Sequence, residues 1–207
     1  MWNLKNGLYI EERLEQNGIL NFTTTVLHND LKIQKNRKEF LKTQFGIKNL
    51  ICATQTHSDN IEIVTEKDLN RKFYAVDGFI TNKQNIPIAV FTADCLPVFI
   101  YDKVKDIIGI VHAGRIGLEK QIIKKSIGIL KEIFHSNSKD ILVAIGPHIK
   151  KCCYDVDLDK AAKKQINGLG IKNISIADVC THENSFFSYR RDKTEKRMLS
   201  LIMMEER

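Results

Sequence analysis

The sequence predicts a protein of the α+β or mixed α/β class. Short runs rich in β-branched residues fill the middle of the chain, and segments with helical spacing of apolar residues lie beside them. No repeat or Gly/Pro-rich linker divides the 207 residues, of which 43% are hydrophobic and 28% charged, as in ordinary globular proteins. We therefore expect a single domain over residues 1–207 that alternates strands and helices.

The first half of the chain is expected to be mostly strand. Residues 19–26 contain three successive threonines and predict a strand. Residues 35–45 predict a helix, because three large apolar side chains fall on one side of it. Short β-branched runs then predict six strands, at residues 49–54, 60–64, 75–81, 88–92, 98–102 and 107–112.

The second half begins with the clearest helical pattern, over residues 119–134. Its isoleucines, leucine and phenylalanine recur at helical spacing, with lysines on the opposite side. Residues 141–145 form a nearly continuous apolar run, which predicts a buried strand. A helix over residues 158–166 and a short strand over residues 174–177 complete the expected elements.

The distribution of charged and apolar residues argues against nucleic acid and membrane partners. The formal net charge is +7, from 32 basic and 25 acidic side chains, but the lysines are scattered and few aromatics lie among them. A nucleic-acid-binding surface would group basic and aromatic side chains, so no nucleic acid partner is expected. No apolar run reaches 18 residues and no signal-peptide core is present, so we expect a cytoplasmic protein without a membrane partner. The oligomeric state stays open, with a monomer as one option.

The chain has five cysteines: Cys52, Cys95, Cys152, Cys153 and Cys180. Without a secretory signal they are expected to be free thiols or metal ligands rather than a disulfide framework, and the absence of a Cys-x-x-Cys motif excludes a zinc ribbon. We expect the adjacent Cys152 and Cys153 to pack as small apolar residues after the Gly-Pro turn, and Cys180 to be structural.

Three side chains are candidate metal ligands. His57, Cys95 and His112 each follow a strand-like run and precede a turn-like segment. Their long spacing fits a catalytic zinc site with three protein ligands from separate strands and one open position. A histidine after an apolar strand is more commonly a hydrogen-bonded structural residue, so spacing alone leaves both interpretations open.

Longer motifs around these residues carry a family resemblance. They are Gln-Thr-His-Ser at 55–58, Asp-Gly-Phe-Ile-Thr at 77–81, Thr-Ala-Asp-Cys-Leu-Pro at 92–97, His-Ala-Gly at 112–114, Ile-Gly-Pro-His-Ile at 145–149, Cys-Cys-Tyr-Asp-Val at 152–156 and Ser-Tyr-Arg-Arg-Asp at 188–192. This ordered series, over residues 57–197, resembles the YfiH family, also called the laccase-domain or multicopper polyphenol oxidoreductase family. Asn36-Arg37 also matches, whereas the family's N-terminal Arg-x-Gly-Gly motif is missing.

The resemblance implies a fold, a metal site and a reaction. The fold is a mixed β-sandwich core flanked by helices, in α/β/β/α layers. The implied metal ligands are His57, Cys95 and His112, with zinc as the metal and copper as the alternative. The implied activity is phosphorolysis of adenosine, inosine, guanosine and methylthioadenosine, with adenosine deamination as a second activity. The expected partners are therefore a purine nucleoside and phosphate.

The residues around the motifs include candidates for the side chains that would carry out deamination and phosphorolysis. A zinc ion lowers the pKa of bound water to about 7, which would suit deamination at neutral pH. Arg115, Arg190 and Arg191 are the candidate phosphate-binding cations, because a guanidinium matches phosphate oxygens, although Arg190 and Arg191 could instead pair with Asp192. Asp94 is a candidate acid/base catalyst or a positioning partner that orients a histidine. We take Asp94, Arg115 and Arg190 as the catalytic candidates.

Two departures from the family concern specificity. The family motif His-Ala-Gly-Trp-Arg-Gly is changed to Arg115-Ile116 at its Trp-Arg positions, so the aromatic side chain is lost. The family's Thr-Gly-Arg is replaced by Thr-Glu-Lys-Arg at residues 194–197. Both changes bear on the substrate pocket more than on the metal ligands.

Two other enzymes remain as alternatives. One is a copper polyphenol oxidase, and the other is a cysteine-type hydrolase that uses Cys95 on peptidoglycan precursors. A three-copper centre needs many histidines, and the remaining ones form no His-x-His pair: His28, His135, His148 and His182. This disfavours laccase chemistry.

Overall fold

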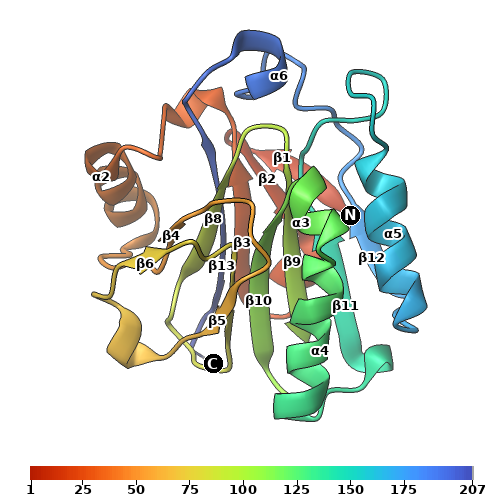
Figure 1. The fold of residues 1–207 in the computed structure, drawn as a ribbon. Coiled ribbons are helices and arrows are strands. Elements are labelled where there is room, and N and C mark those ends of the chain that lie inside the picture. Colours follow the sequence, from red (N-terminus) through yellow and green to blue (C-terminus); the bar gives the residue numbers. More distant parts are fainter. Residues whose placement is uncertain (207) are drawn as a thin grey trace.

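A computed structural model describes residues 1–206 and contains two large sheets (Figure 1). The first has the order β1-β2-β3-β13-β8, with bounds Trp2–Lys5, Leu8–Glu11, Ile19–Thr24, Met198–Met204 and Ile88–Thr92. The second has the order β12-β11-β9-β10-β7-β5, with bounds Asn173–Ile176, Ile141–Ile145, Leu96–Asp102, Ile107–Ala113, Gly78–Thr81 and Ile61–Ile63. A short parallel pair joins β4 (Ala53–Thr54) and β6 (Phe73–Tyr74).

Six α-helices accompany these strands in the described residues: α1 (Glu12–Glu15), α2 (Gln34–Phe45), α3 (Arg115–Glu119), α4 (Ile122–Phe134), α5 (Leu158–Gly168) and α6 (Tyr189–Asp192). Over the same part of the chain, three 3-10 helices add single turns at Val26–His28, Glu66–Asp68 and Ser138–Asp140. None of the helices within residues 1–206 is both long and apolar enough to cross a membrane.

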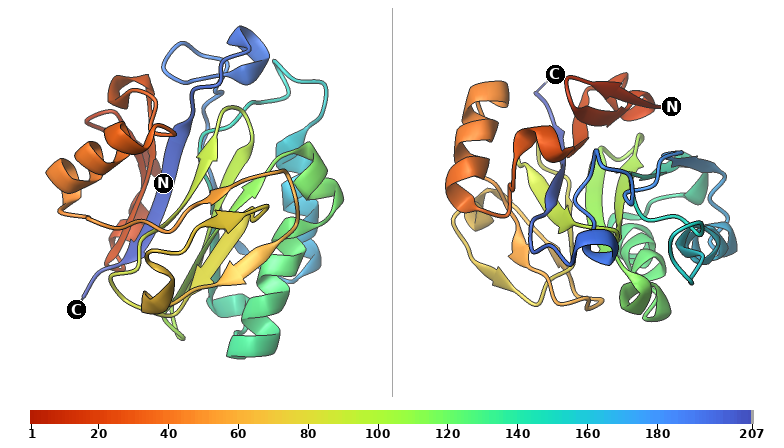
Figure 2. Two further views of the ribbon diagram at one scale, coloured as in Figure 1. Left: turned by 60° about the vertical axis from the view of Figure 1, so that its left-hand side comes forward. Right: turned by 90° about the horizontal axis from the view of Figure 1, so that it is seen from above.

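The elements stack in four layers. Helix α2 covers the outer face of the first sheet, and α3, α4 and α5 cover the outer face of the second, on the opposite side of the molecule (Figures 1 and 2). A third apolar cluster fills the space between the two sheets, where side chains of β8 and β13 meet those of β9 and β10. The predicted α+β class and the α/β/β/α sandwich are therefore confirmed.

Strand β13 is the main element that the sequence analysis missed. It lies in the interior of the first sheet, antiparallel to both β3 and β8. Its sequence, Met-Leu-Ser-Leu-Ile-Met-Met, holds a single β-branched residue, so local propensity does not identify it as a strand. The N-terminal hairpin of β1 and β2 was also not predicted.

Most other predicted elements lie within a few residues of the observed ones, with two clear differences. The strand expected over residues 49–54 is reduced to β4, with a single bridge from Ile51 to Ile88 before it. The prediction of one continuous helix over residues 119–134 is wrong at its start, because α3 ends at Glu119 and α4 begins at Ile122. Gln121 adopts a left-handed conformation, with φ of 61°, and separates α3 from α4.

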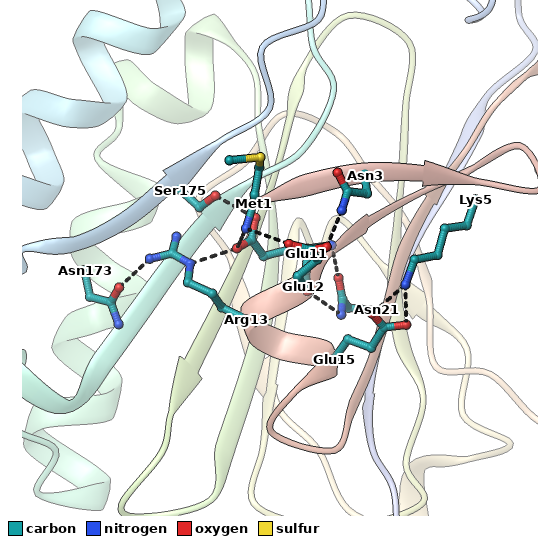
Figure 3. A network of polar contacts seen from close by, with 10 residues as sticks. All are labelled: Met1, Asn3, Lys5, Glu11, Glu12, Arg13, Glu15, Asn21, Asn173 and Ser175. Atoms are coloured by element: carbon teal, nitrogen blue, oxygen red, sulfur yellow. Dashed lines mark hydrogen bonds and ion pairs between the residues drawn. The ribbon is translucent and has the colours of Figure 1, made fainter.

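A polar network ties the N-terminal hairpin of the first sheet to β12, the edge strand of the second (Figure 3). The buried Glu11 carboxylate accepts hydrogen bonds from the Met1 ammonium at 2.9 Å, Arg13 Nε at 2.8 Å and the Ser175 hydroxyl at 2.6 Å. Burial by itself raises the pKa of Glu11, but these hydrogen bonds bring it below its usual value. Arg13 also donates to Asn173, so the end of β2 is joined to β12.

Candidate metal centre

The structure brings together the three predicted ligands, although 38 and 17 residues separate them in the chain. The ligand atoms of His57, Cys95 and His112 all lie within 4.8 Å of one another. Cys95 Sγ is 3.8 Å from His57 Nε2, and the two imidazole rings meet edge to face with 4.8 Å between their centroids. The residues form one cluster that could hold a single metal ion.

Sheet topology explains how Cys95 meets His112. Cys95 lies in the turn where the chain leaves β8 in the first sheet and enters β9 in the second. Strand β9 pairs antiparallel with β10, so its first residues face the last residues of β10, and His112 is opposite Pro97. The thiol and the imidazole therefore project from neighbouring strand ends on a rigid sheet.

His57 is held at the same place by the edge of the first sheet. The Gln55 side chain donates to the Phe91 carbonyl at 2.9 Å and accepts from the Phe91 N–H at 2.7 Å, which fixes this segment beside β8. His57 itself has a φ of 57°, so the chain turns sharply here. The turn directs the following residues toward the second sheet.

Asp77 organises both histidines and was given no role in the sequence analysis. Its buried carboxylate accepts from the main-chain N–H groups of Thr56, His57 and Ser58, from the Ser58 hydroxyl at 2.6 Å and from His112 Nδ1 at 2.8 Å. Burial raises the pKa of Asp77, but the hydrogen bonds from His112 and Ser58 outweigh it and lower the pKa to about 2. Asp77 is therefore a carboxylate that fixes the position of two candidate ligands.

The residues present fit a zinc ion. Because His112 donates from Nδ1 to Asp77, its Nε2 is left to face the cluster, which is the usual arrangement around a metal-ligating histidine. Imidazole and thiolate are both zinc ligands, and three protein ligands leave one position open, as in catalytic zinc sites. Gly114 lies against the cluster, and a Cβ there would come within 2.7 Å of Cys95 Sγ and 3.1 Å of His57 Cδ2. The backbone is thus shaped to leave room at the ligand atoms.

The electrostatics of the cluster favour a thiolate near neutral pH. Burial raises the pKa of Cys95, but His112 and then His57 outweigh it and lower the pKa to about 6. For His112 the effect of burial has the opposite sign and lowers the pKa. The neighbouring Cys95 and Asp77 outweigh burial and raise the pKa of His112 to about 9. A thiolate is the form of cysteine that binds metal.

The structure corrects the expectation that Asp94 orients a histidine. One carboxylate oxygen of Asp94 accepts from the Thr181 hydroxyl at 2.8 Å, and the other accepts from the Arg190 main-chain N–H at 2.7 Å. Asp94 is buried, and its backbone has a φ of 93°. Asp77 orients His112, whereas Asp94 holds the start of α6 against the turn before Cys95.

The three arginines differ in what they contact. Arg115 and Arg190 line the cavity next to the cluster, with loose ion pairs to Glu119 at 3.8 Å and to Asp155 at 3.3 Å. Both side chains are about half exposed.

Arg191 has a different environment. Its guanidinium donates to the carbonyls of His182, Glu183 and Phe186 and pairs with Asp192 at 2.6 Å. The residues that line the cavity, within the described part of the chain, include Arg190 but not Arg191. Arg191 therefore stabilises the preceding loop.

The cluster opens into a large basic cavity of about 1090 Å³. Ten lysine or arginine residues are part of its described lining, together with one carboxylate residue, Asp94. Aromatic side chains also line it: Phe73, Phe91, Tyr154 and Tyr189. Such a cavity suits an anionic ligand that also carries an apolar ring.

The fold and the site define a class: a two-sheet α+β protein with a candidate His/Cys/His metal centre in a basic cavity. The chain belongs to the family described as multi-copper polyphenol oxidoreductase laccase, whose model matches residues 14–159 and 155–205. This confirms the resemblance to the laccase-domain or YfiH family.

Among the proteins similar to this chain are three that are named purine nucleoside phosphorylase. That of Clostridium acetobutylicum is 37% identical, over 79% of this chain and 80% of its own. YlmD of Bacillus subtilis is 33% identical over 98% and 87%, and the protein of Aquifex aeolicus is 33% identical over 77% and 84%.

Solved structures share the whole fold. The hypothetical protein YfiH of Bacillus licheniformis superposes with a TM-score of 0.89 at 26% identity, with 99% of both chains covered. YlmD of Geobacillus stearothermophilus superposes with a TM-score of 0.91 at 23% identity, also with 99% of both chains covered.

Proposed function

We propose that the protein is a zinc-dependent purine nucleoside phosphorylase with adenosine deamination as a second activity. One observation carries the proposal: the His57, Cys95 and His112 cluster opens into a cavity whose lining, among residues 1–206, includes ten basic residues and several aromatic rings. The names of the relatives support a phosphorylase reaction. Adenosine, inosine, guanosine and methylthioadenosine are the proposed substrates, and the cytoplasm is the proposed location.

Phosphorolysis needs a phosphate held near the ribose C1′ while the purine leaves. Arg190 and Arg115 are the proposed phosphate-binding residues, because their guanidinium groups line the cavity and have only loose partners. Asp94 acts as a positioning residue, since it accepts from the Arg190 main-chain N–H and so fixes the start of α6. The aromatic side chains of the lining provide surfaces on which the purine can stack.

Zinc is the proposed metal and copper the alternative, because imidazole and thiolate ligands bind both ions. Three protein ligands would leave a zinc ion one open position, where it would supply Lewis-acid chemistry at neutral pH, as deamination requires. Asp77 accepts from His112 Nδ1, which leaves His112 Nε2 for the metal. The same carboxylate accepts from the His57 main-chain N–H and so positions the turn that carries His57. Elemental analysis of protein purified without added metal distinguishes zinc from copper.

Product analysis tests the proposal. Adenosine, inosine and methylthioadenosine are each incubated with the protein, with and without phosphate, and the products are separated by chromatography. We expect free base only when phosphate is present, and conversion of adenosine to inosine without it. A phenol is added in a parallel incubation. Its oxidation, with the nucleosides unchanged, would favour the copper oxidase alternative instead.

Arg190→Ala is expected to raise the KM for phosphate by about 10- to 100-fold, because a hydrogen bond to a charged group is worth about 1.5–3 kcal/mol. The KM for nucleoside should change much less. Steady-state kinetics with each substrate varied in turn measures both constants.

Arg191→Ala is the matched comparison. Its guanidinium is engaged by three carbonyls and Asp192, so we expect a lower melting temperature with the phosphate KM unchanged. If Arg191→Ala raises the phosphate KM and Arg190→Ala does not, Arg191 binds the phosphate and Arg190 does not.

The double substitution Arg115→Trp and Ile116→Arg restores the family motif and should tighten nucleoside binding. An indole offers more apolar area to a purine than a guanidinium does, and stacking on an aromatic ring is worth about 1–3 kcal/mol in nucleic-acid binders. We expect a lower nucleoside KM with the zinc content unchanged. An unaltered nucleoside KM and turnover would mean that this loop does not contact the base.

A further inference from the structure

A second group of potential metal ligands lies outside the site described above. The Sγ atoms of Cys152, Cys153 and Cys180 all lie within 4.8 Å of one another. Cys152 Sγ is 3.3 Å from Cys153 Sγ and 3.8 Å from Cys180 Sγ. The sequence analysis expected Cys152 and Cys153 to pack as small apolar residues and Cys180 to be structural. Cys180 is indeed part of the apolar cluster under the helices of the second sheet, and Cys153 packs against it. The close approach of all three sulfurs is a further feature, which apolar packing does not require.

The topology of the second sheet creates this convergence. Strands β11 and β12 are parallel neighbours, so the segments that follow them leave the same edge of the sheet. These segments stay side by side: His148 bridges to Cys180, and the Lys150 N–H donates to Cys180 Sγ at 3.3 Å. The turn that begins at Lys150 then places Cys152 and Cys153 over Cys180.

We propose that Cys152, Cys153 and Cys180 bind one thiophilic d10 metal ion, Zn²⁺ or Cu⁺. Zinc–sulfur bonds of about 2.3 Å place neighbouring sulfurs in a tetrahedral site about 3.8 Å apart. The 3.8 Å separation of Cys152 and Cys180 meets this value, and the 3.3 Å separation of Cys152 and Cys153 needs only a small opening. Soft thiolate ligands select these ions over magnesium or calcium.

The burial of the three thiols suits entry of an ion from solvent. Cys152 is exposed, Cys153 is partly buried and Cys180 is buried, so an ion can reach the sulfurs from one side. The nearby His148 is already engaged, through Nδ1 with the Gly146 carbonyl and through Nε2 with Asp159, both at 2.8 Å. The site is therefore an all-sulfur one, with its outer position open to water.

Such an ion would act on the wall of the substrate cavity. Tyr154 follows Cys153 directly and lines the cavity, with the Arg190 guanidinium 5.5 Å from its ring centroid. Asp155 pairs with the same guanidinium. Binding at the three thiols would fix this turn to the segment after β12 and so restrict the environment of Arg190.

The test uses the full chain with Cys95→Ser, which removes the thiolate of the first cluster. Metal-free protein is titrated with Co²⁺, a spectroscopic substitute for zinc, and thiolate-to-cobalt charge-transfer absorption is recorded. We expect this absorption with Cys95→Ser, its loss when Cys152→Ser is added, and its retention when Cys52→Ser is added. Cys52 is a free cysteine of neither cluster, so it controls for removal of a thiol.

Separate arms with Zn²⁺ and with Cu⁺ under anaerobic conditions, each against a competing chelator, identify the ion. Cys152 is exposed, so Cys152→Ser should fold, and far-UV circular dichroism and the melting temperature check this. Absence of charge-transfer absorption in Cys95→Ser, or equal absorption after Cys152→Ser, would overturn the proposal. The free thiols of the denatured, metal-free protein are also counted by titration. A count two below the number of cysteines in the variant would overturn the proposal, because a disulfide would then be present.

Discussion

Cys95→Ala is expected to lower the zinc content by about one ion per chain and to abolish most of the activity. The substitution removes the single thiolate of the His57 and His112 cluster. A catalytic metal contributes several kcal/mol to transition-state stabilisation, so kcat/KM should fall by roughly a thousandfold or more. Elemental analysis and steady-state kinetics of the same preparation measure the two effects.

Cys52→Ala is the matched control for this prediction, because Cys52 is a free thiol that belongs to neither cysteine-containing cluster. It should keep the metal, and because Cys52 also lines the cavity, the zinc content is the reading for which it serves as the control. Wild-type zinc content in Cys95→Ala would remove Cys95 from the ligand set, and full activity without zinc would remove the metal from the reaction.

Asp77→Ala is expected to damage both stability and metal binding. It leaves the donors of Thr56, His57, Ser58 and His112 without their acceptor, and breaking a buried charged pair costs about 3–5 kcal/mol. Metal affinity should fall by about 10- to 100-fold, as when other partners of metal-ligating histidines are removed. Denaturant unfolding and competition with a metal chelator give the two values.

The stability loss should depend on pH with a definite sign. The folded pKa of Asp77 is lowered from 3.8 to about 2, so its contribution is complete above the unfolded value and is lost as the pH falls toward 2. The difference in unfolding free energy between wild type and Asp77→Ala should therefore be full at pH 7 and shrink below pH 4.

Asp59→Ala is a suitable comparison for Asp77→Ala. Asp59 pairs with Lys125 near the surface of the same loop region, so its loss should cost less than about 1 kcal/mol at any pH. A loss that is as large for Asp59→Ala as for Asp77→Ala would show that the effect does not come from the buried network.

The fold could be predicted where local sequence and burial agree. Strands β8, β9, β10 and β11 consist of β-branched and aromatic runs, and the sequence analysis located each of them to within two residues. Strand β13 could not be located in this way, because its methionines and leucines carry no strand preference and its place is decided by pairing with β3 and β8. The break at Gln121 likewise depends on a backbone conformation that side-chain periodicity does not report.

The site was predictable in its ligands but less so in their supports. His57, Cys95 and His112 stand at strand ends and within family motifs, and the structure brings them together. Asp77 also lies within a quoted motif, directly before β7, but nothing local shows that a carboxylate there would reach His112. Arg190 and Arg191 are neighbours in sequence, and only their contacts separate the one at the cavity from the one that holds a loop.

Phosphorus NMR of a mixture of inosine, phosphate and protein tests the central claim most directly. The proposed function predicts that a ribose 1-phosphate signal grows as inorganic phosphate declines, in step with the release of hypoxanthine measured on the same samples. Release of hypoxanthine with the phosphate signal unchanged would mean hydrolysis of the nucleoside, and would contradict phosphorolysis at this site.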